Sequence, residues 1–320
     1  MNDQLVNTST LNITGEVRIV CTSRMNFCLD STNTPLTDDL HKVLAYPRGT
    51  QEHQIWTITY ESQAGYKIIS DNTGRKLASC DIDYVVGITS ASPEDDLMYC
   101  WEIERRKNDV DYTKFMCGEF YIKNVYSNQY LTLRDNNDVG LENKRASEKG
   151  QVWILFENKD LFQQDRKNIN FFTTRDVIKN DSLHYLKRLH DDKQPKHDFT
   201  TSQKTDISFL SDLDYLWEII GHPGGDNTIE NRGGRLVSQD GYAMVFYDDS
   251  TPSENQYWFI DFLTIDPPSL IITNRADGKV LKHARAGGNI VVQDYTLFST
   301  SGNSGDQHWF LSEPRRPEDF

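Results

Sequence analysis

The histidine and aspartate side chains of one polar stretch are the groups in this sequence that could bind a metal ion. The stretch LHYLKRLHDDKQPKHD spans residues 183–198 and holds three imidazoles and three carboxylates: His184, His190, His197, Asp191, Asp192 and Asp198. Such ligands bind zinc when an ordered backbone brings them together. A segment rich in Lys, Asp and Pro is more typical of a solvated loop. We therefore predict no metal site.

Catalytic motifs are the second kind of chemistry to consider. The sequence contains no G-x-S-x-G nucleophile motif, no H-E-x-x-H motif and no glycine-rich loop of the phosphate-binding type. Paired acids such as Asp95–Asp96 and Asp248–Asp249 stand in turn-like contexts. We predict that the protein is not an enzyme and uses no cofactor.

The cysteines point to a reducing compartment. There are five, an odd number, at positions 21, 28, 80, 100 and 117, and no two have C-x-x-C spacing. A secreted scaffold usually carries an even, dense set of cysteines. The first ten residues, MNDQLVNTST, contain neither a basic nor an apolar segment of the signal-peptide type. We therefore expect reduced cysteines and a cytoplasmic location, with leaderless export as the alternative route outward.

Length and charge limit the number of domains and the class of partner. At 320 residues the chain is long enough for about two domains. No apolar run approaches the roughly 18 residues of a membrane span, so we expect no membrane insertion. The net charge is −14, which disfavours nucleic acid and anionic membrane surfaces. Neutral ligands remain the favoured partners.

Six tryptophans mark an internal repeat. Each lies in a similar phrase: HQIWTI, MYCWEI, GQVWIL, DYLWEI, NQYWFI and DQHWFL. An apolar residue stands two positions after every Trp, which places both side chains on one face of a strand. Gln stands two positions before four of them, at Gln54, Gln151, Gln256 and Gln307. We number the repeats one to six by their tryptophans, at positions 56, 101, 153, 217, 258 and 309.

A second phrase recurs upstream of the tryptophans. YKIISDNTGRKL, FYIKNVYSNQYL and LIITNRADGKVL share an Ile, a Ser or Asn two residues later, and a Leu seven residues further on. Turn-forming residues separate two apolar segments in each phrase, which is typical of a β-hairpin. Each repeat therefore predicts about four short strands, with the third ending at the Trp, and no amphipathic helix.

Six such repeats could form one six-bladed propeller or two threefold bodies. The longest gap between tryptophans, 64 residues, lies between the third and the fourth. It contains the polar stretch NKDLFQQDRKNIN at 158–170, which we interpret as a linker. We therefore predict two domains, 1–160 and 161–320.

Three repeats of this length, each closed by Q-x-W, resemble the β-trefoil of the ricin B-chain lectin family. The resemblance covers nearly the whole chain and implies an all-β fold of two tandem β-trefoils. It also implies that all six tryptophans pack into the cores, where burial of an indole stabilises a domain by about 3 kcal/mol.

The resemblance further implies where a neutral sugar would bind. A carboxylate or amide binds paired hydroxyl groups, and an aromatic ring stacks on the C–H face of the sugar. In ricin-like repeats the carboxylate follows a C-x-D or L-D phrase, the aromatic residue comes about 15 residues later, and Asn or Asp often precedes the Gln. Repeat one matches best, with Asp30, Tyr46 and Gln54, although His53 stands where Asn is commoner.

Repeats five and six match in part, and repeats two, three and four look degenerate. Repeat five offers Asp240, Tyr247, Asn255 and Gln256, with the acid two residues late and Ser238 in its expected position. Repeat six offers Gln293, Tyr295, Asp306 and Gln307, with Lys282 near the expected position of the acid. The structural alternative is that Asp30 caps a turn, the glutamines tie loops to the barrel, and the tyrosines are half-buried strand residues.

The resemblance implies a lectin for galactose-type or N-acetylgalactosamine-type glycans, with a role in agglutination, defence or attachment of a toxin. Weak single sites would gain avidity from several repeats or from a homodimer. The alternative is a protein-binding trefoil, either a protease inhibitor or a cytosolic actin-bundling scaffold, with the insertion at 187–214 as its contact. The retained Q-x-W phrases favour the lectin.

Overall fold

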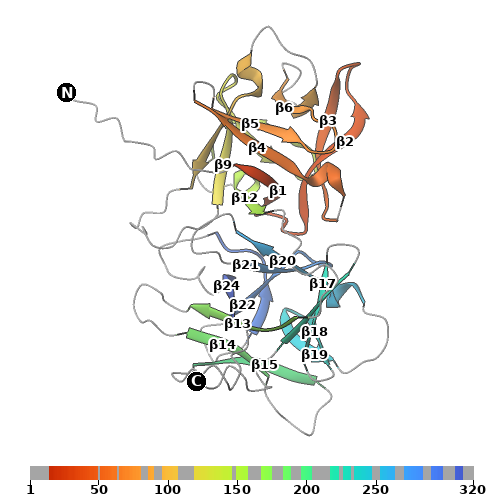
Figure 1. The fold of residues 1–320 in the computed structure, drawn as a ribbon, viewed down its shortest axis with the longest axis vertical. Helices are drawn as coiled ribbons and strands as arrows, with labels where there is room; N and C mark the ends of the chain where they lie inside the picture. The colour runs from red at the N-terminus through yellow and green to blue at the C-terminus, as the bar shows by residue number, and fades with distance from the viewer. Residues whose placement is uncertain are drawn as a thin grey trace, which may run out of the picture.

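Two closed rings of hydrogen-bonded strands form the framework of the protein (Figure 1). The computed structural model describes residues 14–49, 51–62, 65–80, 86–89, 96–106, 119–145, 149–157, 167–174, 183–188, 196–203, 217–222, 226–231, 234–246, 253–263, 270–283, 290–297 and 307–312. Regular structure in these ranges consists of strands and short 3-10 turns. No helix within them is long and apolar enough to cross a membrane.

The first ring is a six-stranded antiparallel barrel. Its strands are β1 (Gly15–Cys21), β4 (Trp56–Glu61), β5 (Gly65–Ser70), β8 (Trp101–Arg105), β9 (Glu119–Asn124) and β12 (Trp153–Glu157). Each pairs with the next in that order, and β12 closes the ring on β1. Three hairpins complete the body: β2 (Phe27–Pro35) with β3 (Leu40–Pro47), β6 (Lys76–Ser79) with β7 (Val86–Thr89), and β10 (Tyr130–Leu133) with β11 (Val139–Glu142).

The second ring repeats this plan. Its strands are β13 (Lys167–Thr174), β16 (Trp217–Gly221), β17 (Asn227–Asn231), β20 (Trp258–Phe262), β21 (Leu270–Asn274) and β24 (Trp309–Ser312), closed by β24 on β13. Its hairpins are β14 (Leu183–Arg188) with β15 (Lys196–Gln203), β18 (Gly234–Gln239) with β19 (Tyr242–Phe246), and β22 (Val280–His283) with β23 (Ile290–Gln293). Each body is a β-trefoil, so the predicted all-β fold of four-stranded repeats is confirmed.

The six tryptophans are fully buried in two separate cores. Trp56, Trp101 and Trp153 belong to the first, and Trp217, Trp258 and Trp309 belong to the second. The prediction that all six are structural is confirmed. The expectation that a strand ends at each Trp is wrong, because every Trp begins a strand. In repeats one, three and five the Gln of Q-x-W ends a 3-10 turn just before it: η1 (Glu52–Gln54), η3 (Lys149–Gln151) and η5 (Glu254–Gln256).

Two stretches predicted as connections contain strands. Residues 167–170 of the expected linker belong to β13, because a barrel strand is needed there to close the second ring. Residues 187–188 and 196–203 of the expected insertion belong to β14 and β15, the hairpin of repeat four. The predicted domain boundary at residues 160 and 161 lies outside the described residues.

The two bodies meet in an apolar cluster of their own. Val20, Met25, Cys28, Ile154 and Phe156 come from the first trefoil, and Leu263, Ile271, Val280 and Tyr295 come from the second. Within this joint the Arg48 guanidinium donates to both carboxylate oxygens of Asp261 and lies 4.3 Å from the ring centroid of Phe259. The joint therefore contains a buried ion pair enclosed by aromatic rings.

Candidate functional site

One hydrogen bond recurs in the repeats and gives a common structural register. The indole Nε1 of Trp56, Trp101, Trp153, Trp258 and Trp309 donates to the carbonyl of a leucine at 2.9–3.0 Å: Leu29, Leu77, Leu131, Leu236 and Leu281. The residue after each leucine therefore occupies an equivalent place. These residues are Asp30, Ala78, Thr132, Val237 and Lys282. Repeat one alone among these five has a carboxylate there.

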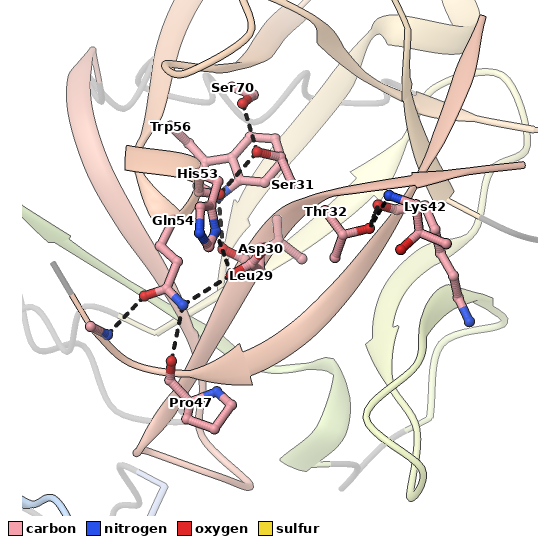
Figure 2. Close-up of polar contacts among 12 residues, drawn as sticks. Leu29, Asp30, Ser31, Thr32, Lys42, Pro47, His53, Gln54, Trp56 and Ser70 are labelled. Atoms are coloured by element: carbon pink, nitrogen blue, oxygen red, sulfur yellow. Dashed lines mark hydrogen bonds and ion pairs between the residues drawn. The ribbon is translucent and has the colours of Figure 1, made fainter. Parts of the chain in front are cut away.

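Asp30 is the centre of a polar cluster in repeat one (Figure 2). Its Oδ2 accepts hydrogen bonds from Gln54 Nε2 at 3.0 Å and from His53 Nδ1 at 2.8 Å. The carboxylate is close to fully covered, since Asp30 is 2% exposed. Asp30 thus fixes the orientation of its neighbours and contacts solvent only at its edge.

Gln54 is occupied entirely by structural hydrogen bonds. Its Nε2 donates one hydrogen to Asp30 and the other to the carbonyl of Pro47 at 2.9 Å, while Oε1 accepts from the Gly49 N–H at 2.9 Å (Figure 2). Both amide hydrogens are therefore used within the fold. The side chain ties the loop after β3 to the barrel, as the structural alternative predicts, and a sugar contact of Gln54 stays a prediction.

Tyr46 lies on the same face of the β2–β3 hairpin as Asp30. Asp30 pairs with Leu44 and Cys28 pairs with Tyr46, so Asp30 and Tyr46 are diagonal neighbours on the two strands. The Cα atoms of such neighbours lie about 7 to 8 Å apart. Tyr46 is 53% exposed and the His53 side chain is 31% exposed. The accessible groups are therefore an aromatic ring and an imidazole, with the carboxylate behind the imidazole.

Burial controls the electrostatics of Asp30. Desolvation raises the pKa of the carboxyl group, and the hydrogen bond from Gln54 and the proximity of His53 oppose that rise only in part. Burial disfavours the charged form because a protein interior solvates an anion less well than water does. This carboxylate consequently takes up a proton at higher pH than an ordinary aspartate.

Repeat five does not reproduce the cluster. The register places Val237 where Asp30 lies in repeat one, one residue before the expected Ser238. Asp240 is exposed and has φ of +53°, followed by Gly241 at +80°, so Asp-Gly forms the tight turn between β18 and β19. Asp240 is thus an exposed turn residue displaced from the position of Asp30, and sugar binding by Asp240 stays a prediction.

Of the other residues predicted in repeat five, Asn255 and Gln256 belong to η5 and Tyr247 is not described. Asn255 Nδ2 donates to the carbonyl of Ser238 at 3.3 Å. Gln256 is the last residue of η5 and is buried, and its Oε1 has no hydrogen-bond partner among the described residues. Tyr247 lies outside the described residues.

Repeat six differs from repeat one at the same two places. Lys282 takes the position of Asp30, and Gln293, which is exposed, takes the position of Tyr46 because it pairs with Val280 as Tyr46 pairs with Cys28. Gln307 is buried, and its amide exchanges hydrogen bonds with the backbone of Thr296. Asp306 lies outside the described residues.

Tyr295 cannot serve as the stacking ring of repeat six. It is 2% exposed, packs in the joint between the trefoils, and donates its hydroxyl hydrogen to Glu119 Oε1 at 3.1 Å. The first trefoil therefore covers the ring that the resemblance places against a ligand.

Repeat three shows how the polar cluster changes when the acid is absent. Gln151 Nε2 donates to Thr132 Oγ1 at 3.1 Å and to the carbonyl of Asn143 at 2.9 Å. The hydroxyl of Thr132 thus replaces the carboxylate of Asp30 as the partner of the Gln. The Gln151 amide therefore has hydrogen-bond partners without a buried carboxylate in this repeat.

Arg48 is a residue beside the site that the sequence reasoning missed. It follows Pro47 directly and holds the loop after β3 against the second trefoil through Asp261. A single arginine after Tyr-Pro carries no sequence signal for such a role. Its backbone N–H also donates to the carbonyl of Asn26 at 2.9 Å, which anchors the loop from a second direction.

The His, Asp and Cys residues considered for metal binding or disulfides lie partly outside the described residues. Among the described residues, no group of three His, Cys, Asp or Glu side chains is placed to hold a metal ion. Cys21, Cys28, Cys80 and Cys100 are buried and form no disulfide, and Cys117 lies outside the described ranges. His190, Asp191 and Asp192 are also outside them.

Comparisons with known proteins gave only distant structural likenesses. No protein-family model and no curated protein matches the chain. A mosquitocidal holotoxin has a TM-score of 0.43 at 16% identity over 94% of this chain, which spans 34% of the toxin. The hemolytic lectin CEL-III has a TM-score of 0.38 at 16% identity, covering 92% of this chain and 64% of the lectin. A non-toxic homologue of type II ribosome-inactivating proteins from bitter gourd, in complex with α-methyl-D-galactoside, has a TM-score of 0.35 at 19% identity, covering 92% and 96%.

Proposed function

We propose that the protein is a lectin that binds a neutral glycan at repeat one. The observation that carries the proposal is that the exposed Tyr46 lies on the same face of the β2–β3 hairpin as Asp30, whose carboxylate is hydrogen-bonded to His53 and Gln54 of η1. A polar edge next to an accessible aromatic ring matches a pyranose, which has hydroxyl groups at its rim and C–H groups on its face.

The favoured ligand is a terminal galactose or N-acetylgalactosamine. In galactose the axial 4-hydroxyl leaves the opposite ring face as a continuous C–H patch that can stack on Tyr46. The hydroxyl groups at the ring edge would then lie toward His53. A site of this size is expected to bind with a Kd of about 1 mM, or about −4 kcal/mol.

The register supports one such site among the five repeats for which it is described. The positions equivalent to Asp30 hold Ala78, Thr132, Val237 and Lys282 in repeats two, three, five and six. Multivalent binding would then come from a homodimer, because one chain would present a single site. Agglutination, and with it a role in defence or toxin attachment, would depend on that dimer.

Glycan-array binding followed by calorimetry with methyl β-galactoside tests the proposal. We expect binding at a stoichiometry of one per chain, and a loss of at least tenfold in affinity for Asp30→Ala and for Tyr46→Ala. The matched controls lie on the same trefoil: Asp71→Ala removes an exposed acid, and Tyr126→Ala removes a tyrosine that is 46% exposed. Neither control should change the affinity.

Two results would reject this proposal. One is an array without any bound glycan. The other is bound glycan whose affinity is the same in the Asp30→Ala and Tyr46→Ala variants as in the unmodified protein.

A further inference from the structure

We propose that His53 is a specificity-determining residue that accepts a hydrogen bond from a ligand hydroxyl through Nε2. The inference rests on the proposed function, since it assigns a role within the same site. It concerns the one position at which repeat one departs from the ricin-like pattern, which commonly has Asn or Asp before the Gln.

The hydrogen bonds around Asp30 determine the tautomer of His53. An ionised carboxylate can only accept hydrogen bonds. Asp30 Oδ2 lies 2.8 Å from His53 Nδ1, so Nδ1 must carry the hydrogen in this contact. The neutral imidazole then has no hydrogen on Nε2, which becomes an acceptor.

The backbone and Gln54 hold the imidazole in this orientation. The carbonyl of His53 accepts a hydrogen bond from Ser31 Oγ at 3.0 Å, and Ser31 in turn contacts Ser70 Oγ at 2.8 Å (Figure 2). Gln54 binds the same carboxylate oxygen as His53 and thereby fixes Asp30. The ring is therefore preorganised before a ligand arrives.

Nε2 of His53 is open to solvent. It has no hydrogen-bond partner among the described residues, and it is not one of the buried polar atoms that lack a partner. The side chain is 31% exposed, whereas the side chain of Asp30 is 3% exposed. A ligand would therefore meet the imidazole before the carboxylate.

This arrangement selects a ligand by the direction of its hydrogen bond. An acceptor at Nε2 requires a ligand O–H that donates, and a group that can only accept would leave both partners without a hydrogen. An Asn at this position would bind Asp30 with one amide hydrogen and still offer the second to a ligand acceptor. His53 thus narrows the ligands to glycans with a free hydroxyl at the matching ring position.

Deoxy and deoxyfluoro galactosides test the direction of the bond, because fluorine can accept but cannot donate. At one ring position we expect both analogues to lose about tenfold in affinity, the effect of losing one hydrogen bond to Nε2. In His53→Asn the fluorinated analogue at that position should bind better than the deoxy analogue. His222→Asn, in the second trefoil, is the matched control and should behave like the unmodified protein.

Nitrogen-15 NMR of the imidazole tests the tautomer directly, with the signals assigned by their loss in His53→Asn. We expect a protonated Nδ1 and an unprotonated Nε2 whose signal moves when galactoside is added. An Nε2–H tautomer, or a fluorinated analogue bound as well as galactoside at every position, would overturn the inference. Failure of the proposed function looks different, because no galactoside would then bind at all.

Discussion

Repeats one and six share a scaffold and differ in the side chains that face solvent. In both, the indole donates to a leucine carbonyl at 3.0 Å and the Gln amide ties a loop to the barrel. The equivalent surface positions hold Asp30 and Tyr46 in one and Lys282 and Gln293 in the other. Contacts that close the barrel are thus common to both repeats, whereas the groups suited to a ligand occur only in repeat one.

The largest expected effect tests the shared scaffold. Trp56→Ala and Trp309→Ala each remove a fully buried indole and its hydrogen bond, so each should lower the free energy of unfolding by about 3–5 kcal/mol. Urea denaturation followed by circular dichroism would measure this. Losses that differ by several kcal/mol would show that the two repeats do not depend on the indole equally.

The next largest effect concerns the ion pair in the joint between the two trefoils. Asp261→Ala leaves the buried guanidinium of Arg48 without its carboxylate, and we expect a cost of about 3 kcal/mol. Thermal unfolding would measure it. The exposed Asp277→Ala is a control and should cost less than about 1 kcal/mol.

A graft of the two differing residues tests whether these side chains alone explain the difference between repeats one and six. Lys282→Asp together with Gln293→Tyr gives repeat six the acid and the ring of repeat one. We expect a second, weaker galactoside site, seen in calorimetry as a stoichiometry that rises from one toward two. A stoichiometry that stays at one would mean that the loop around His53 contributes more than these two side chains.

Acidification should separate ligand release from unfolding. The folded pKa of Asp30 is raised, so protonation of this group favours the folded state, and its contribution to stability is complete at low pH and declines as pH rises through the folded pKa. Protonation nevertheless weakens the hydrogen bond that orients His53, because a neutral carboxyl group is a poorer acceptor than a carboxylate. On acidification, galactoside affinity should therefore begin to fall at a higher pH than the pKa of an ordinary aspartate, which is about 3.9. Tryptophan fluorescence should remain native over this pH range. Unfolding that precedes release would contradict this.

The smallest expected effect comes from the turn of repeat five. Asp240→Asn keeps a residue that tolerates positive φ, so both stability and galactoside affinity should change by less than about 0.5 kcal/mol. A clear loss of binding would restore Asp240 to the site.

The fold was readable from the sequence because its determinants recur. Six tryptophans at similar spacing, each with a leucine upstream, predicted buried indoles and repeated hairpins. The Asp-Gly pair at 240–241 also carries a readable signal, since Asp-Gly favours a two-residue hairpin turn.

The site was only partly readable, because burial depends on contacts distant in sequence. Asp30 and His53 were identified, but the coverage of Asp30 and the full use of the Gln54 amide follow from the loop at Pro47 and Gly49. Arg48 and its partner Asp261 are 213 residues apart, and no local pattern links them.

The hydroxyl contact of Tyr295 with Glu119 has a consequence for how tandem trefoils can diversify. A surface that fastens one module to another is withdrawn from molecular recognition, so the joined protein has less area for capture than its two halves would have apart. In a tandem trefoil, part of the surface that could bind a ligand is instead buried in the interface between the two domains.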